Sequence, residues 1–200
     1  NFFVGQFIDA LILGVMVGIT LWLFNIEYAT TIACVIGLTG LIPLLGIYVG
    51  GDEATFEAMK PILSYMGENI IRMGDNGKGL VMKICHNALV SQIQNGVNET
   101  STLAAANGID IMTFAQAISY GGGQNFYLDS KKEPISKEDY TTAFSIENEY
   151  KDVNICMNLA KECGVLMPGE ENALHVYQKA MDAGYGKEDF CATIKVVRER

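Results

Sequence analysis

From residue 78 to residue 107 the sequence keeps a helical pattern without a convincing stop signal. Apolar residues such as Ile84, Ala88 and Leu103 recur at helical spacing along this run. It ends at Asn107-Gly108, where glycine suits a helix C-cap. A helix of nearly thirty residues is long for a globular protein. The pattern therefore predicts a mainly helical fold built on one long central helix.

The start of this helix follows a glycine-rich loop, and residues 74–87 read GDNGKGLVMKICHN. Gly77 and Gly79 allow backbone conformations and close approaches that a Cβ atom would prevent. Lys83 and Asn87 lie four residues apart, so both project from one face of the helix. Together they could hold and protonate a small oxygen-rich ligand. On spacing alone the favoured interpretation is an ordinary loop-to-helix junction with a solvated lysine.

A polar side runs along the same predicted helix, parallel to the apolar stripe. It consists of Lys83, Asn87, Ser91, Gln94 and Asn98. The simpler interpretation is a solvated face, as on most surface helices. The alternative is that these side chains form one wall of a binding site.

The first 50 residues differ from the rest, because their charged residues are Asp9 and Glu27 alone. Residues 10–26 and 28–51 are apolar runs that approach or reach the roughly 20 residues needed to span a bilayer. They predict a hydrophobic helical hairpin in residues 1–45 and membrane contact of residues 1–50. The sequences VGQFIDALILGVMVGITLWLFNIEYA and GLTGLIPLLG resemble a fragment of an autoinducer-2 exporter family permease. The alternative is a buried pair of helices or strands in a soluble protein.

The formal net charge of −9 arises mostly after residue 50 and argues against a nucleic-acid surface. The five cysteines are odd in number and include no C-x-x-C pair. This pattern is typical of buried thiols in a reducing compartment, and we expect residues 51–200 to be cytoplasmic. His86 and His175 are far apart, so no metal site is expected.

Further elements are predicted on both sides of the long helix. Residues 46–51 and 69–73 favour short strands, with an amphipathic helix in residues 52–67 between them. Helices are expected over residues 109–120 and 143–163, from Pro168 to Gly184, and over residues 187–200. Residues 128–140 are charged and contain Pro134, which indicates a surface loop.

Three ordered motifs carry a resemblance to a known family. The first contains Gly74, Gly77, Gly79, Lys83, His86 and Asn87, with His86 in place of an asparagine of the family pattern. The second is YKDVNICMNLA, with Lys151 and Asp152, and the third is the closing segment GYGKEDFCATIK. With these motifs, residues 46–200 resemble the C-terminal part of the β-hydroxyacid dehydrogenases, the family of 3-hydroxyisobutyrate dehydrogenase.

The resemblance implies an all-helical dehydrogenase C-terminal domain and a role for each motif. Lys83 would be the catalytic general acid/base, while Asn87 and Gly79 would bind a small hydroxy-acid substrate. Lys151 and Gly77 would contact the cofactor, NAD or NADP. A homo-oligomer would form through the long helix. The expected reaction is oxidation of a 3-hydroxy acid, such as 2-(hydroxymethyl)glutarate or 3-hydroxyisobutyrate, to its semialdehyde.

The resemblance also predicts a domain organisation. Residues 74–200 would form the helical substrate and dimerisation domain, and residues 46–73 a strand-helix-strand remnant of a Rossmann domain. The G-x-G-x-x-G fingerprint of a complete Rossmann domain does not occur in this sequence, so we expect that domain to be absent and the chain alone to be inactive. The chain then looks like a chimera joined near residues 44–49. The alternative function is a membrane-anchored self-association module or a permease fragment.

Overall fold

A computed structural model describes Val15 and residues 46–198, and the chain divides into two compact units, Asn1–Met82 and Lys83–Arg200. The hairpin predicted in residues 1–45 lies outside the described residues, as does the junction up to residue 45. Within the part that is described, no helix is long and apolar enough to cross a membrane.

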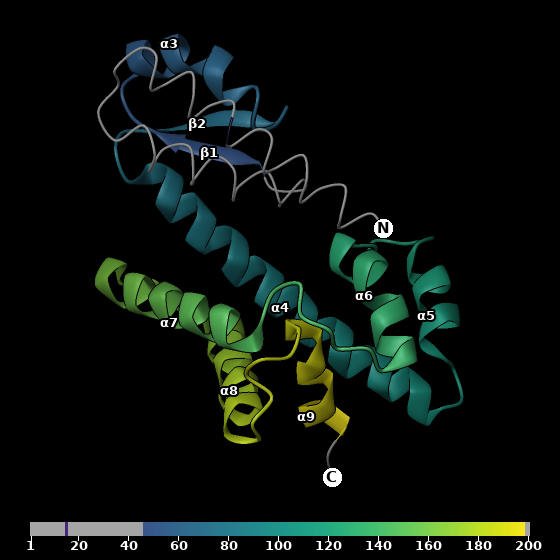
Figure 1. Ribbon diagram of the computed structural model, residues 1–200. Coiled ribbons are helices and arrows are strands. Elements are labelled where there is room, and N and C mark those ends of the chain that lie inside the picture. Colours follow the sequence, from purple (N-terminus) through teal and green to yellow (C-terminus); the bar gives the residue numbers. More distant parts are fainter. Residues whose placement is uncertain (1–14, 16–45, 199–200) are drawn as a thin grey trace. The chain divides into compact units, whose positions relative to one another are not determined.

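The first unit contains a small strand-helix-strand arrangement (Figure 1). Strands β1 (Ile47–Gly50) and β2 (Ile70–Gly74) pair in parallel, with Ile47 opposite Ile70. Helix α3 (Glu53–Leu63) connects them. It begins where the Asp52 carboxylate accepts a hydrogen bond from the Thr55 N–H at 2.9 Å, which satisfies one of the free amides of the first turn. The order of these three elements is the one expected from the sequence.

The second unit is helical and is organised around α4 (Lys78–Ala106), which begins in the first unit and has the predicted length (Figure 1). The mainly helical fold class is therefore confirmed. Side chains of Asp110, Asn125 and Ser145 cap the helices that follow them. These and the remaining elements are α5 (Ile111–Ile118), α6 (Phe126–Lys137), α7 (Ile146–Cys163), α8 (Pro168–Asp182), the 3-10 helix η1 (Phe190–Thr193) and α9 (Ile194–Arg198).

Apolar side chains of the second unit gather in three clusters. One joins α4, α5, α6 and the C-terminal elements, with Leu128 and Ile194 at its centre. Another joins α7, α8 and η1 through Val153 and Tyr177. The third is smaller and holds α7 against α4 through Ile84, Ala88 and Cys156. This last contact matters for the site, because it fixes the position of α7 beside the start of the long helix.

The surface loop predicted for residues 128–140 is wrong, since most of this segment is helix α6. Leu128 and Ile135 lie seven residues apart, which places them two turns apart on one face, and both are buried. Pro134 falls in the last turn, and the helix ends just beyond it at Glu138, a residue with φ of 54°. Burial of this apolar face outweighs the charged composition and the proline.

Two other predictions need correction. Helices begin later than expected in two places, at Ile146 instead of residue 143 and at Ile194 instead of residue 187. Ser145 and Asp189 explain this, because their side chains cap the following turns and fix the residues before them as loop. The cysteines are also not uniformly buried. Among those described, Cys156 and Cys191 are buried while Cys85 and Cys163 are exposed, and all four are free.

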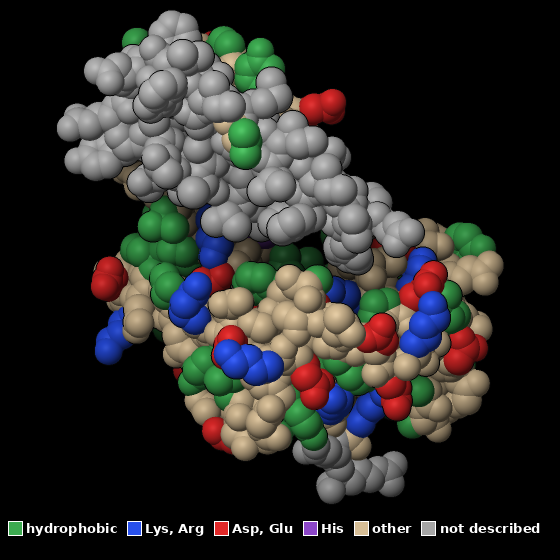
Figure 2. All heavy atoms as spheres, in the orientation of Figure 1, with side chains coloured by type: hydrophobic (Ala, Val, Ile, Leu, Met, Phe, Trp, Pro, Cys, Tyr) green, Lys and Arg blue, Asp and Glu red, His purple; other side chains and the backbone are tan. Residues whose placement is uncertain are grey.

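Charged side chains are interspersed on the visible face of the helical unit. Figure 2 shows Lys and Arg side chains next to Asp and Glu side chains, with apolar atoms between them. Exposed ion pairs of the helical unit include Lys132–Asp129, Lys137–Glu133 and Lys187–Glu147. Exposed ion pairs of this kind contribute little to stability.

Candidate functional site

Lys83 and Asn87 meet at one buried carboxylate. Both project from the same face of α4, and both donate to Asp152 Oδ2 on α7, Lys83 through Nζ and Asn87 through Nδ2 at 2.7 Å. The Asp152 side chain is 4% exposed, whereas that of Lys83 is 43% exposed. The arrangement thus anchors a lysine at a fixed carboxylate while leaving part of the side chain accessible to a ligand.

Of the three residues that meet here, Asp152 is the one for which the sequence analysis predicted no role. It occupies an inward position of α7, one turn after Glu149 and next to the buried Val153. A carboxylate within the apolar stripe of a helix is the signal that could have identified it, because such a group needs a partner. The partner lies 69 residues earlier in the sequence, which no local pattern reveals.

Lys151 points away from the helix interior, as neighbouring positions on a helix face different directions. Its side chain is 62% exposed, and Nζ lies 3.5 Å from Asp152 Oδ1. Lys151 is therefore solvated, whereas the neighbouring Asp152 side chain is 4% exposed. An exposed ammonium on this side of α7 suits an anionic group of a cofactor.

The two glycines selected from the sequence each have a structural reason to be glycine. Gly77 has φ of 89°, a conformation that residues with a Cβ rarely adopt. At Gly79 a Cβ atom would lie 2.5 Å from the carbonyl oxygen of Tyr48, so α4 packs directly on the backbone of β1. These contacts explain the glycines within the first unit, and their predicted contacts with cofactor and substrate stay predictions.

The polar side of α4 beyond Asn87 is buried, so the expectation of a solvated face is wrong there. Ser91 Oγ donates to Glu170 at 2.8 Å, and Asn98 Nδ2 donates to Thr193 Oγ1 at 3.0 Å. Between them, Gln94 donates to the Phe190 carbonyl at 2.6 Å and accepts from the Tyr177 hydroxyl. A polar row thus continues from the Lys83 site into the helical unit, where it ties α4 to α8 and η1.

Burial raises the pKa values of titratable side chains that lie next to the buried polar face of α4. Desolvation raises the pKa of Tyr177 well above its ordinary value, so the phenol stays protonated and donates to Gln94. Burial likewise raises the pKa of the Cys156 thiol to about 11. Cys156 is thus a neutral packing group next to α4, and a thiolate nucleophile is not expected there.

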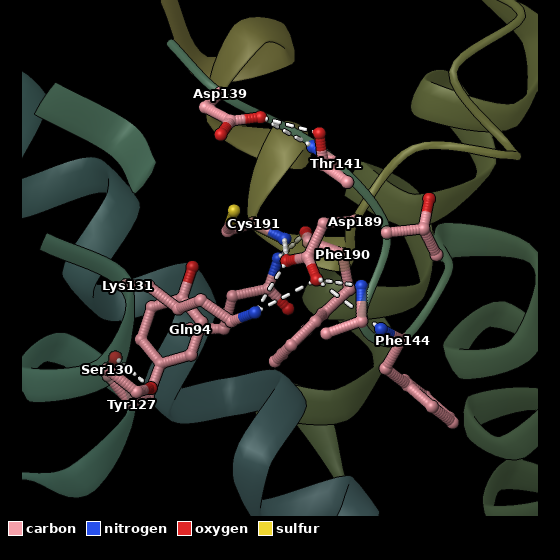
Figure 3. A network of polar contacts seen from close by, with 12 residues as sticks. Gln94, Tyr127, Ser130, Lys131, Asp139, Thr141, Phe144, Asp189, Phe190 and Cys191 are labelled. Atoms are coloured by element: carbon pink, nitrogen blue, oxygen red, sulfur yellow. Dashed lines mark hydrogen bonds and ion pairs between the residues drawn. The ribbon is translucent and has the colours of Figure 1, made fainter. Parts of the chain in front are cut away.

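A second buried charge lies at the far end of the row (Figure 3). Lys131 Nζ is 2.9 Å from the Asp189 carboxylate, which also accepts backbone N–H bonds from Ala143, Phe144 and Cys191. Burial alone would raise the pKa of Asp189, but Lys131 and the hydrogen bond from the Cys191 N–H lower it below its usual value. The group orders the segment before α7 and the start of η1, so its role is structural.

In the described residues no group of His, Cys, Asp and Glu side chains could hold a metal ion. The side chains that meet in the Lys83 site are an amine, an amide and a carboxylate. The Asn87 amide has two N–H donors and one oxygen acceptor, and the bond to Asp152 uses one N–H. Its second N–H and Oδ1 can therefore bind a ligand. Such a set can position an oxygen-rich molecule and exchange a proton with it.

Known proteins that are similar in sequence to this chain include several dehydrogenases. The chain is 31% identical over 153 residues to 2-(hydroxymethyl)glutarate dehydrogenase of Eubacterium barkeri, covering 76% of this chain and 51% of that protein. It is 29% identical to NAD-dependent L-serine dehydrogenase of Pseudomonas aeruginosa, with coverage of 76% and 53%. The chain thus spans about half the length of the curated relatives that it matches.

Solved structures and a family model agree with these relatives. The 3-hydroxyisobutyrate dehydrogenase of Salmonella typhimurium matches with a TM-score of 0.69 and 30% identity, over 74% of this chain and 52% of that one. That of Mycobacterium tuberculosis, solved with L-serine, matches with a TM-score of 0.68 and 26% identity, over 75% and 54%. The family model matches residues 77–197, which contain Lys83, Asn87 and Asp152. The chain belongs to the family described as NAD-binding of NADP-dependent 3-hydroxyisobutyrate dehydrogenase.

Proposed function

We propose that this chain provides the catalytic-lysine domain of an NAD- or NADP-dependent β-hydroxyacid dehydrogenase. The single observation that supports this most is the convergence of Lys83 and Asn87 on the buried Asp152 carboxylate. The proposed reaction is oxidation of a 3-hydroxy acid to its semialdehyde. Names of the relatives suggest 2-(hydroxymethyl)glutarate, 3-hydroxyisobutyrate or L-serine as substrates to test first.

In the oxidation, the Lys83 amine takes the proton of the substrate hydroxyl while the carbon–oxygen double bond forms. NAD or NADP, when bound, would supply the hydride acceptor that this oxidation needs. Asp152 holds the lysine in place, and its charge stabilises the ammonium that results. Asn87, fixed by its own bond to Asp152, orients the substrate oxygen next to Nζ. In the reverse direction the ammonium returns the proton to the developing alkoxide.

In the second unit, the exposed Lys151 ammonium can pair with an anionic group of NAD or NADP. In the first unit, taken by itself, the loop at Gly77 has open space where a Cβ would lie, and Gly77 is proposed as a further cofactor contact. The predicted domain organisation, with residues 46–73 as the end of a Rossmann domain and residues 74–200 as the helical domain, is part of the same proposal. So are inactivity of the chain alone and a cytoplasmic location of residues 51–200.

A hybrid enzyme tests the catalytic role. Residues 46–198 replace the corresponding half of the Eubacterium barkeri dehydrogenase, and formation of the reduced nicotinamide is followed with 2-(hydroxymethyl)glutarate. We expect turnover that falls about 10²- to 10⁴-fold in Lys83→Ala, because that is the range for loss of a general acid/base. Lys161→Ala, at an exposed position on α7, is the matched control and keeps its activity. A folded hybrid whose turnover does not depend on Lys83 would refute the proposal.

A further inference from the structure

A pocket of about 280 Å³, which we call the α9 pocket, opens within the helical unit. Its lining comes from the end of α6, from the segments that follow α6 and α8, and from α9. Two tyrosines, two cations and one carboxylate form this lining, namely Glu138, Tyr140, Tyr185, Lys195 and Arg198. The volume is close to the lower end of the range for small-molecule sites, about 300–1,000 Å³. The proposed reaction uses none of these residues.

Lys195 is a fixed part of the pocket wall. Its Nζ lies 4.5 Å from the ring centroid of Tyr140 and 4.6 Å from that of Tyr185. The same ammonium donates to Glu188 Oε2 at 2.5 Å. Two aromatic faces and a counter-charge therefore hold Lys195 in one place and balance its charge. The two rings and the aliphatic stem of the lysine give the pocket an apolar wall.

Arg198, the other cation of the lining, is held much more weakly. Its Nη1 lies 3.6 Å from Glu138 Oε1, and the two side chains are 36% and 75% exposed. An exposed pair at this distance contributes little, so Glu138 can turn away from Arg198 at small cost. Glu138 also ends α6 with φ of 54°, at a cap position where glycine or asparagine is usual. The preference of the backbone therefore does not explain a glutamate there.

We propose that the α9 pocket binds a small monocarboxylate through Arg198, and that Glu138 takes the place of this carboxylate when the pocket has no ligand. With Glu138 in place, Glu188 and Glu138 balance the charges of Lys195 and Arg198. When Glu138 turns toward solvent, one positive charge is left over, which a single carboxylate neutralises. The guanidinium suits it, because its planar N–H donors match the two carboxylate oxygens.

The apolar wall determines the rest of the ligand. A carboxylate bound to Arg198 places its body against the rings of Tyr140 and Tyr185, so an aromatic or aliphatic body fits better than a polar one. The ligand class is thus a small monocarboxylate with an apolar body. This inference does not depend on the proposed dehydrogenase reaction, and its test measures binding without turnover.

Ligand-observed ¹⁹F NMR with the full 200-residue chain tests the role of Arg198. The probe is 4-fluorobenzoate, and 4-fluorobenzamide is its neutral counterpart. We expect saturable broadening of the benzoate signal at millimolar concentrations and binding of the benzamide that is weaker by about tenfold or more, because it lacks the charge. Arg198→Gln should weaken benzoate binding by a similar factor. Lys187→Gln, which breaks the exposed Lys187–Glu147 pair, is the matched control and binds benzoate like wild type.

Glu138→Gln tests the role of the resident carboxylate, and its expected effect has the opposite sign. Without the competing charge, benzoate should bind more tightly, by up to about fivefold, the range for an exposed ion pair. Loss of fold cannot produce tighter binding. Glu133→Gln, which breaks the exposed Lys137–Glu133 pair of α6, is the matched control and leaves the affinity unchanged.

Four results would overturn the inference. They are the lack of saturable benzoate binding to wild type, equal affinity for benzoate and benzamide, unchanged benzoate binding in a folded Arg198→Gln protein, and unchanged or weaker binding in Glu138→Gln. Because Lys83 has no part in this measurement, a hybrid enzyme without turnover refutes the proposed function alone, and any of these four results refutes the α9 pocket alone.

Discussion

At the scale of single residues, the Lys131–Asp189 pair shows what a buried charge does for this fold. Its side chains are 14% and 2% exposed, and Asp189 also collects backbone N–H groups before α7 and in η1. We expect Asp189→Asn to lower the free energy of unfolding by about 3–5 kcal/mol, because it leaves Lys131 buried without a counter-charge. Glu147→Gln, which breaks the exposed Lys187–Glu147 pair, should change it by less than about 1 kcal/mol.

The same pair predicts a pH dependence with a definite sign. The folded-state pKa of Asp189 is lowered, so its stabilising contribution is complete above the unfolded value of 3.8 and is lost as pH falls through the folded value. Urea unfolding of wild type and Asp189→Asn should therefore differ most near neutral pH and converge in strong acid. A difference between the two that grows as the pH falls would contradict this account.

Residue-scale chemistry was only partly predictable from the sequence. The shared face of Lys83 and Asn87 follows from a spacing of four residues and is confirmed by their common bond to Asp152. The identity of that carboxylate depends on packing of α7 against α4, which is a tertiary contact. The buried Glu149 was equally hidden, because glutamate on a helix is usually solvated.

At the scale of elements, α6 is where local patterns and tertiary packing disagree. Leu128→Ala should lower the free energy of unfolding by about 2–5 kcal/mol, since the side chain is 2% exposed and its removal leaves a cavity. Phe126→Ala is the matched control in the same helix, because Phe126 is 63% exposed, and its effect should stay within about 0.5 kcal/mol. Thermal unfolding monitored by circular dichroism compares the two. Equal losses would mean that α6 does not pack as described.

Other elements were predictable because their ends carry clear signals. Pro168 in the first turn of α8 and the left-handed glycines Gly108 and Gly164 mark boundaries that a sequence shows directly. The charged helix α6 has no such clear signal, because its buried residues Tyr127 and Leu128 are separated from the buried Ile135 by mostly polar residues and a proline. Side-chain caps were missed for a related reason, because Ser145 and Asp189 look like ordinary loop residues until their partners are known.

At the scale of the whole molecule, the long helix α4 has large apolar side chains that are exposed in the part of the chain that the structure describes. Leu89 and Leu103 are 59% and 66% exposed. Fourteen residues separate them, which is close to four turns, and the exposed Gly96 lies midway with open space around it. A second helix could approach closely along such a stripe. Such a surface is what the homo-oligomer through α4, expected from the sequence, would need.

Sedimentation velocity of the full chain tests this association. We expect wild type to sediment as an oligomer and Leu103→Glu as a monomer, because a charge in the middle of an apolar contact must be desolvated without a partner. Leu166→Glu is the matched control, since Leu166 is 93% exposed and lies between α7 and α8, away from the stripe. It should leave the sedimentation coefficient unchanged. If Leu103→Glu and wild type sediment alike, α4 is not the association surface, and the exposed leucines need another explanation.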